Sequence, residues 1–383
     1  MRVLVIGAGV GGLATAQGLL DHGHEVRVFE KAPALRTTGA AFTLWSNGTG
    51  ILGELGVSLD RLGGPVDVLE QRSSDGRRLL TIEVARAARH FGHPHVSLPR
   101  RRLLERLAGG LPGGTVAFGR DCTAIGQEDG HAWAGFGGTT VTGDVLVGAD
   151  GHHSIVRETL WGAGLARPSG WATWQGLGEV PVGVASSRTG LMIVGREGLC
   201  GLMPAGDGLL QWWFDLRWTP GEPVPASPIA DLRRRFGHWA SPVPEVLAAV
   251  DEADAAFFPH HRHRVPRTWG EGRITLAGDA AHTMPPTVAQ GANQALEDAW
   301  ALVDALKDLG VRDVPGALRR YERTRSRRAA LVSRVAGTEY TNRYRPRLSR
   351  LAPDALVSRA YTRWLGLVSG YLPGSATSRP GTR

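Results

Sequence analysis

The stretch RVLVIGAGVGGLATAQGLLDHGHEVRVFE, residues Arg2 to Glu30, decides the fold of this 383-residue chain. A β-branched apolar run over residues 2–6 leads directly into a glycine-rich turn and then into a helical run over residues 13–21. A second apolar run, over residues 25–29, ends at Glu30. The order strand, turn, helix, strand is the setting that the G-x-G-x-x-G dinucleotide fingerprint requires. We therefore expect a Rossmann-like α/β domain at the start of the chain.

Each residue of the fingerprint has a chemical purpose. Gly7, Gly9 and Gly12 allow the backbone to approach a pyrophosphate, and the start of the following helix favours its negative charge. Glu30 follows the turn at about 20 residues, the distance at which an acid accepts hydrogen bonds from the adenosine ribose. The alternative is a glycine-rich turn that binds no nucleotide, and the strand, the helix and the acid together argue against it. The fingerprint alone does not separate FAD from NAD.

A second stretch, RITLAGDAAHTMPPTVAQGANQALEDA over Arg273–Ala299, places other groups beside such a ligand. A short apolar strand over residues 274–277 ends beside Asp279, and the two prolines that follow keep the next residues extended. A helix then begins near Gly291, so its free N–H groups and one carboxylate face the same place. This combination suits a ligand that carries both hydroxyls and an anionic edge.

The run over residues 140–149 repeats this arrangement, because it reads as a strand that ends in Asp150-Gly151. Two strand tips that carry aspartate, beside one glycine turn, define a crevice at the carboxyl edge of a parallel sheet. A long dinucleotide should lie in that crevice.

Between residues 170 and 265 the pattern changes to short strands separated by Pro and Gly turns. Tryptophan is concentrated here, and a tryptophan-rich sheet is most often core. The strand over residues 209–216 alternates, so a ligand cavity is faced either by Gln211, Trp213 and Asp215 or by Trp212 and Phe214, and the sequence leaves both open. The histidines at 260, 261 and 263 suggest a metal site, but adjacent histidines on a strand face opposite ways and no carboxylate completes a set. We expect no metal.

The net charge and the two cysteines limit which partners and which cellular compartment we expect. The net charge of +8 arises in the tail, where fifteen Arg from residue 319 onward stand against three acidic residues. Because no nucleic-acid module is visible, we expect no nucleic-acid partner. Cys122 and Cys200 form no metal or redox spacing, and no apolar run is long enough to span a membrane. We expect a cytoplasmic protein without integral membrane association, as a monomer or homodimer.

Three motifs, GAGVGG with Glu30, VLVGADGHHSIVR and the Arg273–Ala299 stretch, occur in one order. Together they resemble those of the single-component FAD-dependent aromatic hydroxylases, the para-hydroxybenzoate hydroxylase-like flavoprotein monooxygenases. The resemblance runs from the N-terminus to about residue 334. It implies a Rossmann-like FAD-binding domain interrupted by a mostly antiparallel β substrate domain and followed by C-terminal helices. The ranges expected are 1–65, 96–168 and 266–315 for FAD, 66–95 and 169–265 for substrate, and 316–383 for the helical segment.

The resemblance also implies roles for single residues. Glu30 and Lys31 would lie at the adenosine end of FAD, Arg100 would reach the cofactor, and Asp279 would contact the ribityl chain. The residues expected to bind FAD are Gly7, Gly9, Gly12, Glu30, Lys31, Thr43, Arg100, Asp150, Asp279, Gly291, Ala292 and Asn293. His282 is a candidate catalytic residue, and a histidine packed behind the motif is the alternative.

The implied reaction uses NADH or NADPH to reduce FAD and adds O2 at flavin C4a, and the resulting hydroperoxide transfers one oxygen atom to the substrate. Gln211, Trp213 and Trp212 are the candidate substrate contacts. The tryptophan-rich, weakly charged substrate domain favours hydroxylation or epoxidation of a bulky aromatic or polycyclic small molecule, in secondary metabolism, over a small carboxylate. A flavin-dependent reductase or dehydrogenase of an isoprenoid or polyketide is the alternative. Two departures stand out: the family's common Trp-Arg-Gly reads Trp174-Gln175-Gly176 here, and Val288 or Ala289 stands where glycine is frequent.

Overall fold

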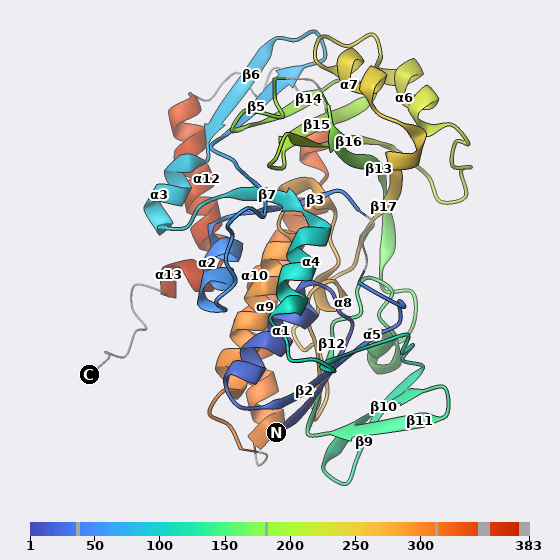
Figure 1. Cartoon of the computed structure of the whole chain (residues 1–383), viewed down its shortest axis with the longest axis vertical. Coiled ribbons are helices and arrows are strands. Elements are labelled where there is room, and N and C mark those ends of the chain that lie inside the picture. Colours follow the sequence, from blue (N-terminus) through green and yellow to red (C-terminus); the bar gives the residue numbers. More distant parts are fainter. Residues whose placement is uncertain (36–38, 181–182, 311–312, 344–352, 375–383) are drawn as a thin grey trace.

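A five-stranded parallel sheet forms the lower half of the molecule in Figure 1, in the order β18-β12-β1-β2-β8. The structure is a computed structural model that describes residues 1–35, 39–180, 183–310, 313–343 and 353–374. The strands are β1 (Arg2–Ile6), β2 (Glu25–Glu30), β8 (Val116–Phe118), β12 (Val145–Gly148) and β18 (Ile274–Leu276). Most side chains of β1 and β12 are buried, which explains why these strands read as continuous apolar runs. The predicted α/β core is confirmed.

Helices α1 (Val10–Asp21), α9 (Gly291–Leu306) and α10 (Val314–Ala336) pack beside this sheet. Helix α1 lies against α9, and α9 lies against α10. The close approach of α1 and α9 needs glycine, because a Cβ on Gly18 would lie 2.7 Å from Cγ2 of Val303. The apolar faces of these helices and the sheet form the larger hydrophobic core. Three shorter helices complete this half: α4 (Arg100–Gly109), α5 (Ile155–Trp161) and α8 (Asp279–His282).

A seven-stranded sheet forms the upper half, in the order β17-β13-β16-β15-β14-β5-β6. Its strands are β5 (Val68–Ser73), β6 (Arg78–Glu83), β13 (Arg167–Glu179), β14 (Thr189–Val194), β15 (Gly198–Pro204), β16 (Leu209–Arg217) and β17 (Ala256–Arg262). All neighbours are antiparallel except β14 and β5, which are parallel. Helices α6 (Pro228–Phe236) and α7 (Val243–Ala249) cover one face and form a second core with it. The expected mostly antiparallel sheet is present.

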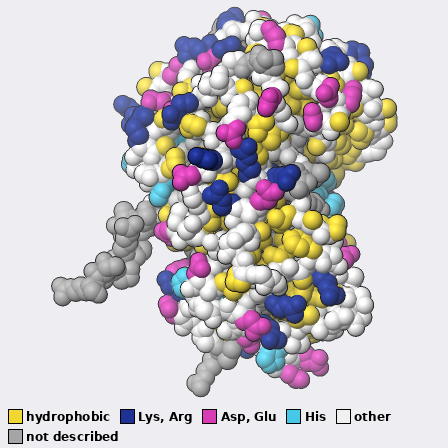
Figure 2. Space-filling view, viewed as in Figure 1, with side chains coloured by type: hydrophobic (Ala, Val, Ile, Leu, Met, Phe, Trp, Pro, Cys, Tyr) yellow, Lys and Arg dark blue, Asp and Glu magenta, His cyan; other side chains and the backbone are white. Residues whose placement is uncertain are grey.

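Smaller elements connect the two halves. An antiparallel sheet of β3 (Ala41–Leu44), β7 (Val96–Pro99) and β4 (Gly64–Pro65) lies between them, with α2 (Ser46–Glu54) and α3 (Ala85–Phe91) nearby. A separate meander of β9 (Ala124–Glu128), β10 (His131–Phe136) and β11 (Thr139–Gly143) leads into β12. The space-filling view shows basic and acidic side chains interspersed over this face of the molecule (Figure 2).

Polar contacts help to orient the C-terminal helices. Helix α12 (Asp354–Val368) is followed by a short helix, α13 (Tyr371–Gly374). Two leucines of α12, Leu356 and Leu367, are 56% and 59% exposed. Ser358 of the same helix accepts a hydrogen bond from the Glu83 N–H of β6. Residues 344–352 and 375–383 of the predicted helical segment lie outside the described part of the chain.

The residues after Pro285 are also not extended as predicted. They form a 3₁₀ turn, η2 (Pro286–Val288), which ends with Ala289 at a φ of +47°. Left-handed backbone favours glycine, which accounts for the frequency of glycine in the family near this position. No helix within the described residues is long and apolar enough to cross a membrane.

Candidate cofactor and substrate site

The three glycines of the turn after β1 differ in their surroundings. A Cβ on Gly7, which has a φ of +106°, would lie 2.4 Å from the Ala149 oxygen, and one on Gly12 would lie 2.0 Å from the Gly7 oxygen. A Cβ built on Gly9 meets no heavy atom of the described chain within 4 Å. Protein packing therefore requires glycine at Gly7 and Gly12, whereas Gly9 borders open space at the N-terminus of α1. A pyrophosphate in that space would meet the helix dipole.

Glu30 lies at the end of β2 beside this turn. Its two carboxylate oxygens each accept a hydrogen bond of 2.9 Å, one from the Ala8 N–H and one from the Ala32 N–H. Each oxygen can accept a second bond, so the backbone fixes the orientation of Glu30 while leaving capacity for ribose hydroxyls. Lys31 follows as an exposed side chain.

Asp279 lies just beyond the tip of β18 and opens α8. Its side chain is exposed, yet burial raises the pKa of its carboxyl, against the opposing effects of His282, Arg100 and Arg157. Asp279 is therefore accessible to solvent, and with Gly9 and Gly291, at which a built Cβ meets no heavy atom of the described chain within 4 Å, it defines the open space called the cleft below. The structure therefore brings Arg100, at the start of α4, toward the predicted ribityl contact.

Asp150 follows β12 on the same edge of the sheet. Its Oδ2 accepts a 3.3 Å hydrogen bond from the Val156 N–H, and its buried Oδ1 has no partner among the described residues. Burial raises the pKa of this carboxyl. Arg157, one turn into α5, donates to the His152 and Ala280 oxygens at 2.6 and 3.2 Å and ties this strand tip to α8. The sequence indicates no role for Arg157 beyond its fixed spacing from Asp150 in the VLVGADGHHSIVR motif.

Helix α9 supplies the donors predicted near Gly291. Its cap residue Gln290 makes no side-chain capping bond, and the N–H groups of Gly291, Ala292 and Asn293 have no acceptor within the described chain. A Cβ on Gly291 would meet nothing within 4 Å, so this end of the helix faces open space. Free N–H groups at the positive end of a helix favour an anionic ligand edge.

The side chain of Asn293 clamps the surrounding loops. Its Oδ1 accepts from the Trp45 N–H at 2.9 Å, and its Nδ2 donates to the Thr43 and Ala289 oxygens at 3.0 and 2.8 Å. Asn293 is fully buried, so all of these bonds lie away from water. The clamp fixes Thr43 and the left-handed Ala289 beside the start of α9, and only the backbone of Asn293 remains for a ligand.

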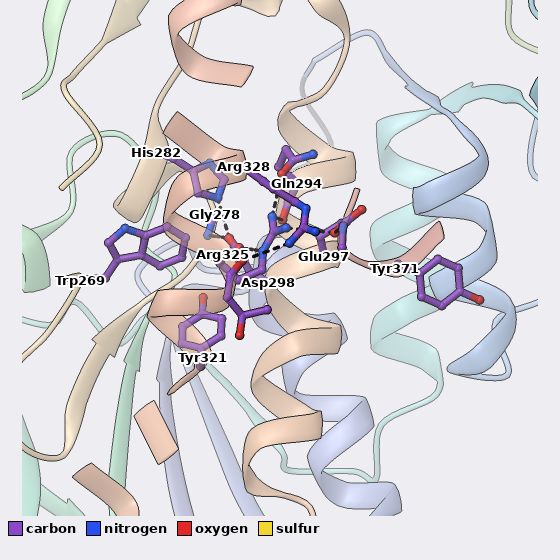
Figure 3. A network of polar contacts seen from close by, with 12 residues as sticks. Trp269, Gly278, His282, Gln294, Glu297, Asp298, Tyr321, Arg325, Arg328 and Tyr371 are labelled. Carbon is purple, nitrogen blue, oxygen red and sulfur yellow. Dashed lines mark hydrogen bonds and ion pairs between the residues drawn. The ribbon is translucent and has the colours of Figure 1, made fainter. Parts of the chain in front are cut away.

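His282 does not face the cleft, which corrects its candidacy as a catalytic residue. It is fully buried, and its Nε2 lies 2.6 Å from Oδ2 of Asp298 (Figure 3). The Asp298 carboxylate also accepts from Arg325 Nε at 2.7 Å, and Arg325 reaches Glu297 at 2.9 Å. Burial opposes ionisation of Asp298, but His282 and Arg325 outweigh it and hold the pKa of its carboxyl below the ordinary value. His282 thus belongs to the network that joins α8, α9 and α10.

The alternation along β16 is decided by packing. Trp212 is 1% exposed and lies in the core under α6 and α7. Trp213 packs on the opposite face, over Gly201 and against the larger hydrophobic core, which contains the parallel sheet. Gln211 shares that face, because its Nε2 donates to the Ala41 oxygen of β3 at 3.3 Å. The structure brings Gln211 and Trp213 toward the cleft and Trp212 away from it, so Trp212 is removed from the predicted substrate contacts.

The model of a protein family described as "FAD binding domain" matches residues 1–336 of this chain. The chain belongs to this FAD-binding family. An FAD-dependent urate hydroxylase of Klebsiella oxytoca is 32% identical over 331 residues, covering 85% of this chain and 86% of the relative. A 3-amino-4-hydroxybenzoate 2-monooxygenase of Streptomyces platensis is 36% identical over 365 residues and covers 88% of each chain. A solved structure of Klebsiella pneumoniae HpxO with FAD and uric acid matches with a TM-score of 0.89 at 27% identity, covering 96% of this chain and 97% of that one.

This member of the FAD-binding family is therefore a para-hydroxybenzoate hydroxylase-like flavoprotein monooxygenase, an oxidoreductase that inserts one oxygen atom. Its cofactor is FAD, and O2 is its co-substrate. The residues described above fit FAD: open space at Gly9, an accessible carboxylate at Asp279 and free N–H groups at the start of α9.

Proposed function

We propose that this flavoprotein uses NADH or NADPH and O2 to hydroxylate or epoxidise a bulky, neutral aromatic or polycyclic molecule, in secondary metabolism. Bound FAD supplies the redox chemistry by passing electrons from the nicotinamide to O2. The protein positions the substrate ring and keeps water out of the cleft, since water would divert the reaction to hydrogen peroxide.

The sheet face that carries Gln211 and Trp213 is the observation that supports this substrate class. Its central positions on β13, β15 and β16 carry the carboxamides of Gln175 and Gln211, the indole of Trp213 and the thioether of Met203. Carboxamides donate and accept hydrogen bonds without a net charge, and the indole provides a flat apolar surface. A carboxylate-bearing substrate would instead be expected to meet an arginine fork, and Gln175 replaces the arginine that is common in the family.

The FAD-binding role of the twelve sequence-predicted residues is part of this proposal. Asp279 would accept from the ribityl hydroxyls, Gly9 would admit the pyrophosphate, and the N-terminus of α9 would stabilise negative charge on the reduced ring system. Arg100 and Arg157 would offset the charge of Asp279 and of the phosphates.

A screen of NAD(P)H consumption by the FAD-loaded protein tests the substrate class. Neutral polycyclic phenols and indoles should stimulate consumption and appear as products with one added oxygen atom. Rapid turnover with small benzoates and none with the polycyclic compounds would contradict the proposal. Product reduced or dehydrogenated without added oxygen would instead favour the reductase or dehydrogenase alternative. The Gln175→Arg variant offers a matched comparison, since it should shift the preference toward benzoates.

A further inference from the structure

A buried polar cluster lies on the substrate sheet and includes none of the residues expected to bind FAD. Thr173 of β13 pairs in register with Asp215 of β16, and the Thr173 Oγ1 hydrogen-bonds both the Asp215 carboxylate and Nε2 of His260 on β17, the latter at 2.6 Å. Asp215 and Thr173 are each 3% exposed and His260 is fully buried. Burial raises the pKa of Asp215 to about 6, against the opposing effect of His260. Three strands thus converge on one histidine.

A second carboxylate reaches this histidine from the end of α10. Oε1 of Glu339 lies 3.0 Å from His260 Nδ1 and accepts from the Ser169 hydroxyl at 2.6 Å, while Oε2 accepts from the Asn342 amide at 3.0 Å. Glu339 has a φ of +51°, a left-handed backbone conformation that is unfavourable for residues other than glycine. Such backbone strain persists only where surrounding contacts hold it. These contacts hold residues 339–342 on the substrate sheet.

The held segment carries Tyr340. It begins the 3₁₀ turn η4 (Tyr340–Asn342), which contacts β15 of the substrate sheet. The same turn contacts η2, in the half of the molecule that contains the parallel sheet and is called the FAD half below. The Tyr340 side chain is 57% exposed, yet burial raises the pKa of its hydroxyl, the combination already seen at Asp279 in the cleft. Burial raises the pKa of the Tyr361 hydroxyl on α12, and the nearby Tyr340 adds to this effect.

Tyr361 connects this segment to the start of α9. Its ring packs edge-on against Trp45 with ring centroids 5.7 Å apart, and the Trp45 backbone is clamped by Asn293 at the N-terminus of α9. Tyr340 therefore lies on a turn that contacts both the substrate sheet and η2, near Tyr361 of α12. The hydroxyl of its exposed side chain offers one hydrogen-bond donor and acceptor at this junction of the two halves.

We propose that Tyr340 is a substrate-contacting residue that hydrogen-bonds a hydroxyl or heteroatom of the aromatic substrate, and that His260, with Thr173, Asp215 and Glu339, is the latch that positions it. The inference rests on the proposed function, because it concerns the same aromatic site. His260 acts through the segment that carries Tyr340 and does not itself contact substrate.

Equilibrium binding to the FAD-loaded protein tests the contact without requiring turnover. Naphthol and naphthalene serve as probes that differ only in the hydroxyl, and flavin absorbance reports their binding. The Tyr340→Phe variant should lose about tenfold in naphthol affinity, the value of one hydrogen bond, with naphthalene affinity unchanged. Equal naphthol affinities in the variant and the wild type would overturn the contact, as would equal losses for both probes, which a purely structural role predicts.

The latch has its own comparison. His260→Gln should reproduce the selective naphthol loss, and the double variant with Tyr340→Phe should lose no more than either single variant, because both changes remove one interaction. His131→Gln alters an exposed histidine beside Asp144 and should retain wild-type affinities. Additive losses, or an unaffected His260→Gln, would overturn the latch while leaving the contact in place. A wild-type protein that binds FAD but neither probe would reject the neutral-aromatic proposal itself, and the Tyr340 contact with it.

Discussion

At the residue scale, Gly9 and Gly12 allow two effects on FAD binding to be separated. Alanine at Gly12 would place Cβ against the Gly7 oxygen, so Gly12→Ala should destabilise the apoprotein and abolish FAD binding. Alanine at Gly9 meets no protein atom, so Gly9→Ala should leave apoprotein unfolding unchanged and weaken FAD binding alone, because Cβ enters the proposed phosphate space. Thermal denaturation of the apoproteins and FAD titration provide the two measurements. Equal FAD affinity in Gly9→Ala and the wild type would contradict the placement of the pyrophosphate.

Asp279 makes a complementary prediction at the other end of the cleft. Asp279→Ala should purify colourless or with FAD affinity reduced by about 10–100-fold, because charge-assisted hydrogen bonds are worth about 1.5–3 kcal/mol. Asp304→Ala, which changes an exposed carboxylate on α9, is the control and should retain its flavin. Asp279→Ala protein that remains yellow at full occupancy would reject the ribityl contact.

The raised pKa of Asp215 should make the free energy of unfolding depend on pH. Its folded pKa of about 6 lies above the ordinary 3.8, so its stabilising effect is complete below pH 3.8 and is lost as the pH rises through 6. Asp215→Asn cannot ionise, so its stability relative to wild type should improve by roughly 1 kcal/mol between pH 5 and 7.5. Urea unfolding at the two pH values measures this difference. A stability difference that does not change with pH would show that Asp215 ionises normally.

The sequence predicted the positions of single residues where a turn or the end of a strand determines them. Gly7 and Gly12 are fixed by atoms within the motif or one strand away, and Asp150 and Asp279 end strands of one parallel sheet. The left-handed Ala289 was not predictable, because alanine gives no local signal for a positive φ and the conformation depends on the distant clamp of Asn293.

At the element scale, the buried network of Arg325 holds α9 in place. Arg325→Leu would leave Glu297 and Asp298 fully buried without their cation, so unfolding free energy should fall by about 3–5 kcal/mol. Arg320→Leu on the same helix breaks only an exposed pair with Asp313 and should change stability by less than about 1 kcal/mol. Urea denaturation compares the two variants. Similar small losses in both would mean that the network does not anchor the helix.

Elements were predicted where local periodicity is strong and mispredicted where tertiary contacts decide. The strand around Trp213 was found, but its inward face depends on α6 and α7 covering Trp212. In α12, the Ser358 hydroxyl accepts a hydrogen bond from the Glu83 N–H of β6, and Leu356 remains exposed. A side-chain pattern cannot reveal which neighbour a helix will meet.

At the scale of the whole molecule, the function depends on segments far apart in the chain. The parallel sheet, the substrate sheet and the segment after α10 meet around one cleft, and His260 contacts Glu339 across 79 residues. The motifs predicted the FAD half because each is local. The substrate side could not be predicted to the same depth, since Tyr340 and Gln211 acquire their positions only when both sheets are assembled.

Insertion of one atom of O2 into a neutral aromatic molecule can be measured with isotopically labelled O2. The experiment supplies labelled O2 and NAD(P)H to the FAD-loaded protein with the aromatic compound that best stimulates NAD(P)H consumption, and measures the product by mass spectrometry. We expect a product carrying one labelled oxygen atom, formed in proportion to the nicotinamide consumed. Unlabelled product, or consumption of O2 that yields only hydrogen peroxide with every neutral aromatic tested, would contradict the proposed oxygen insertion.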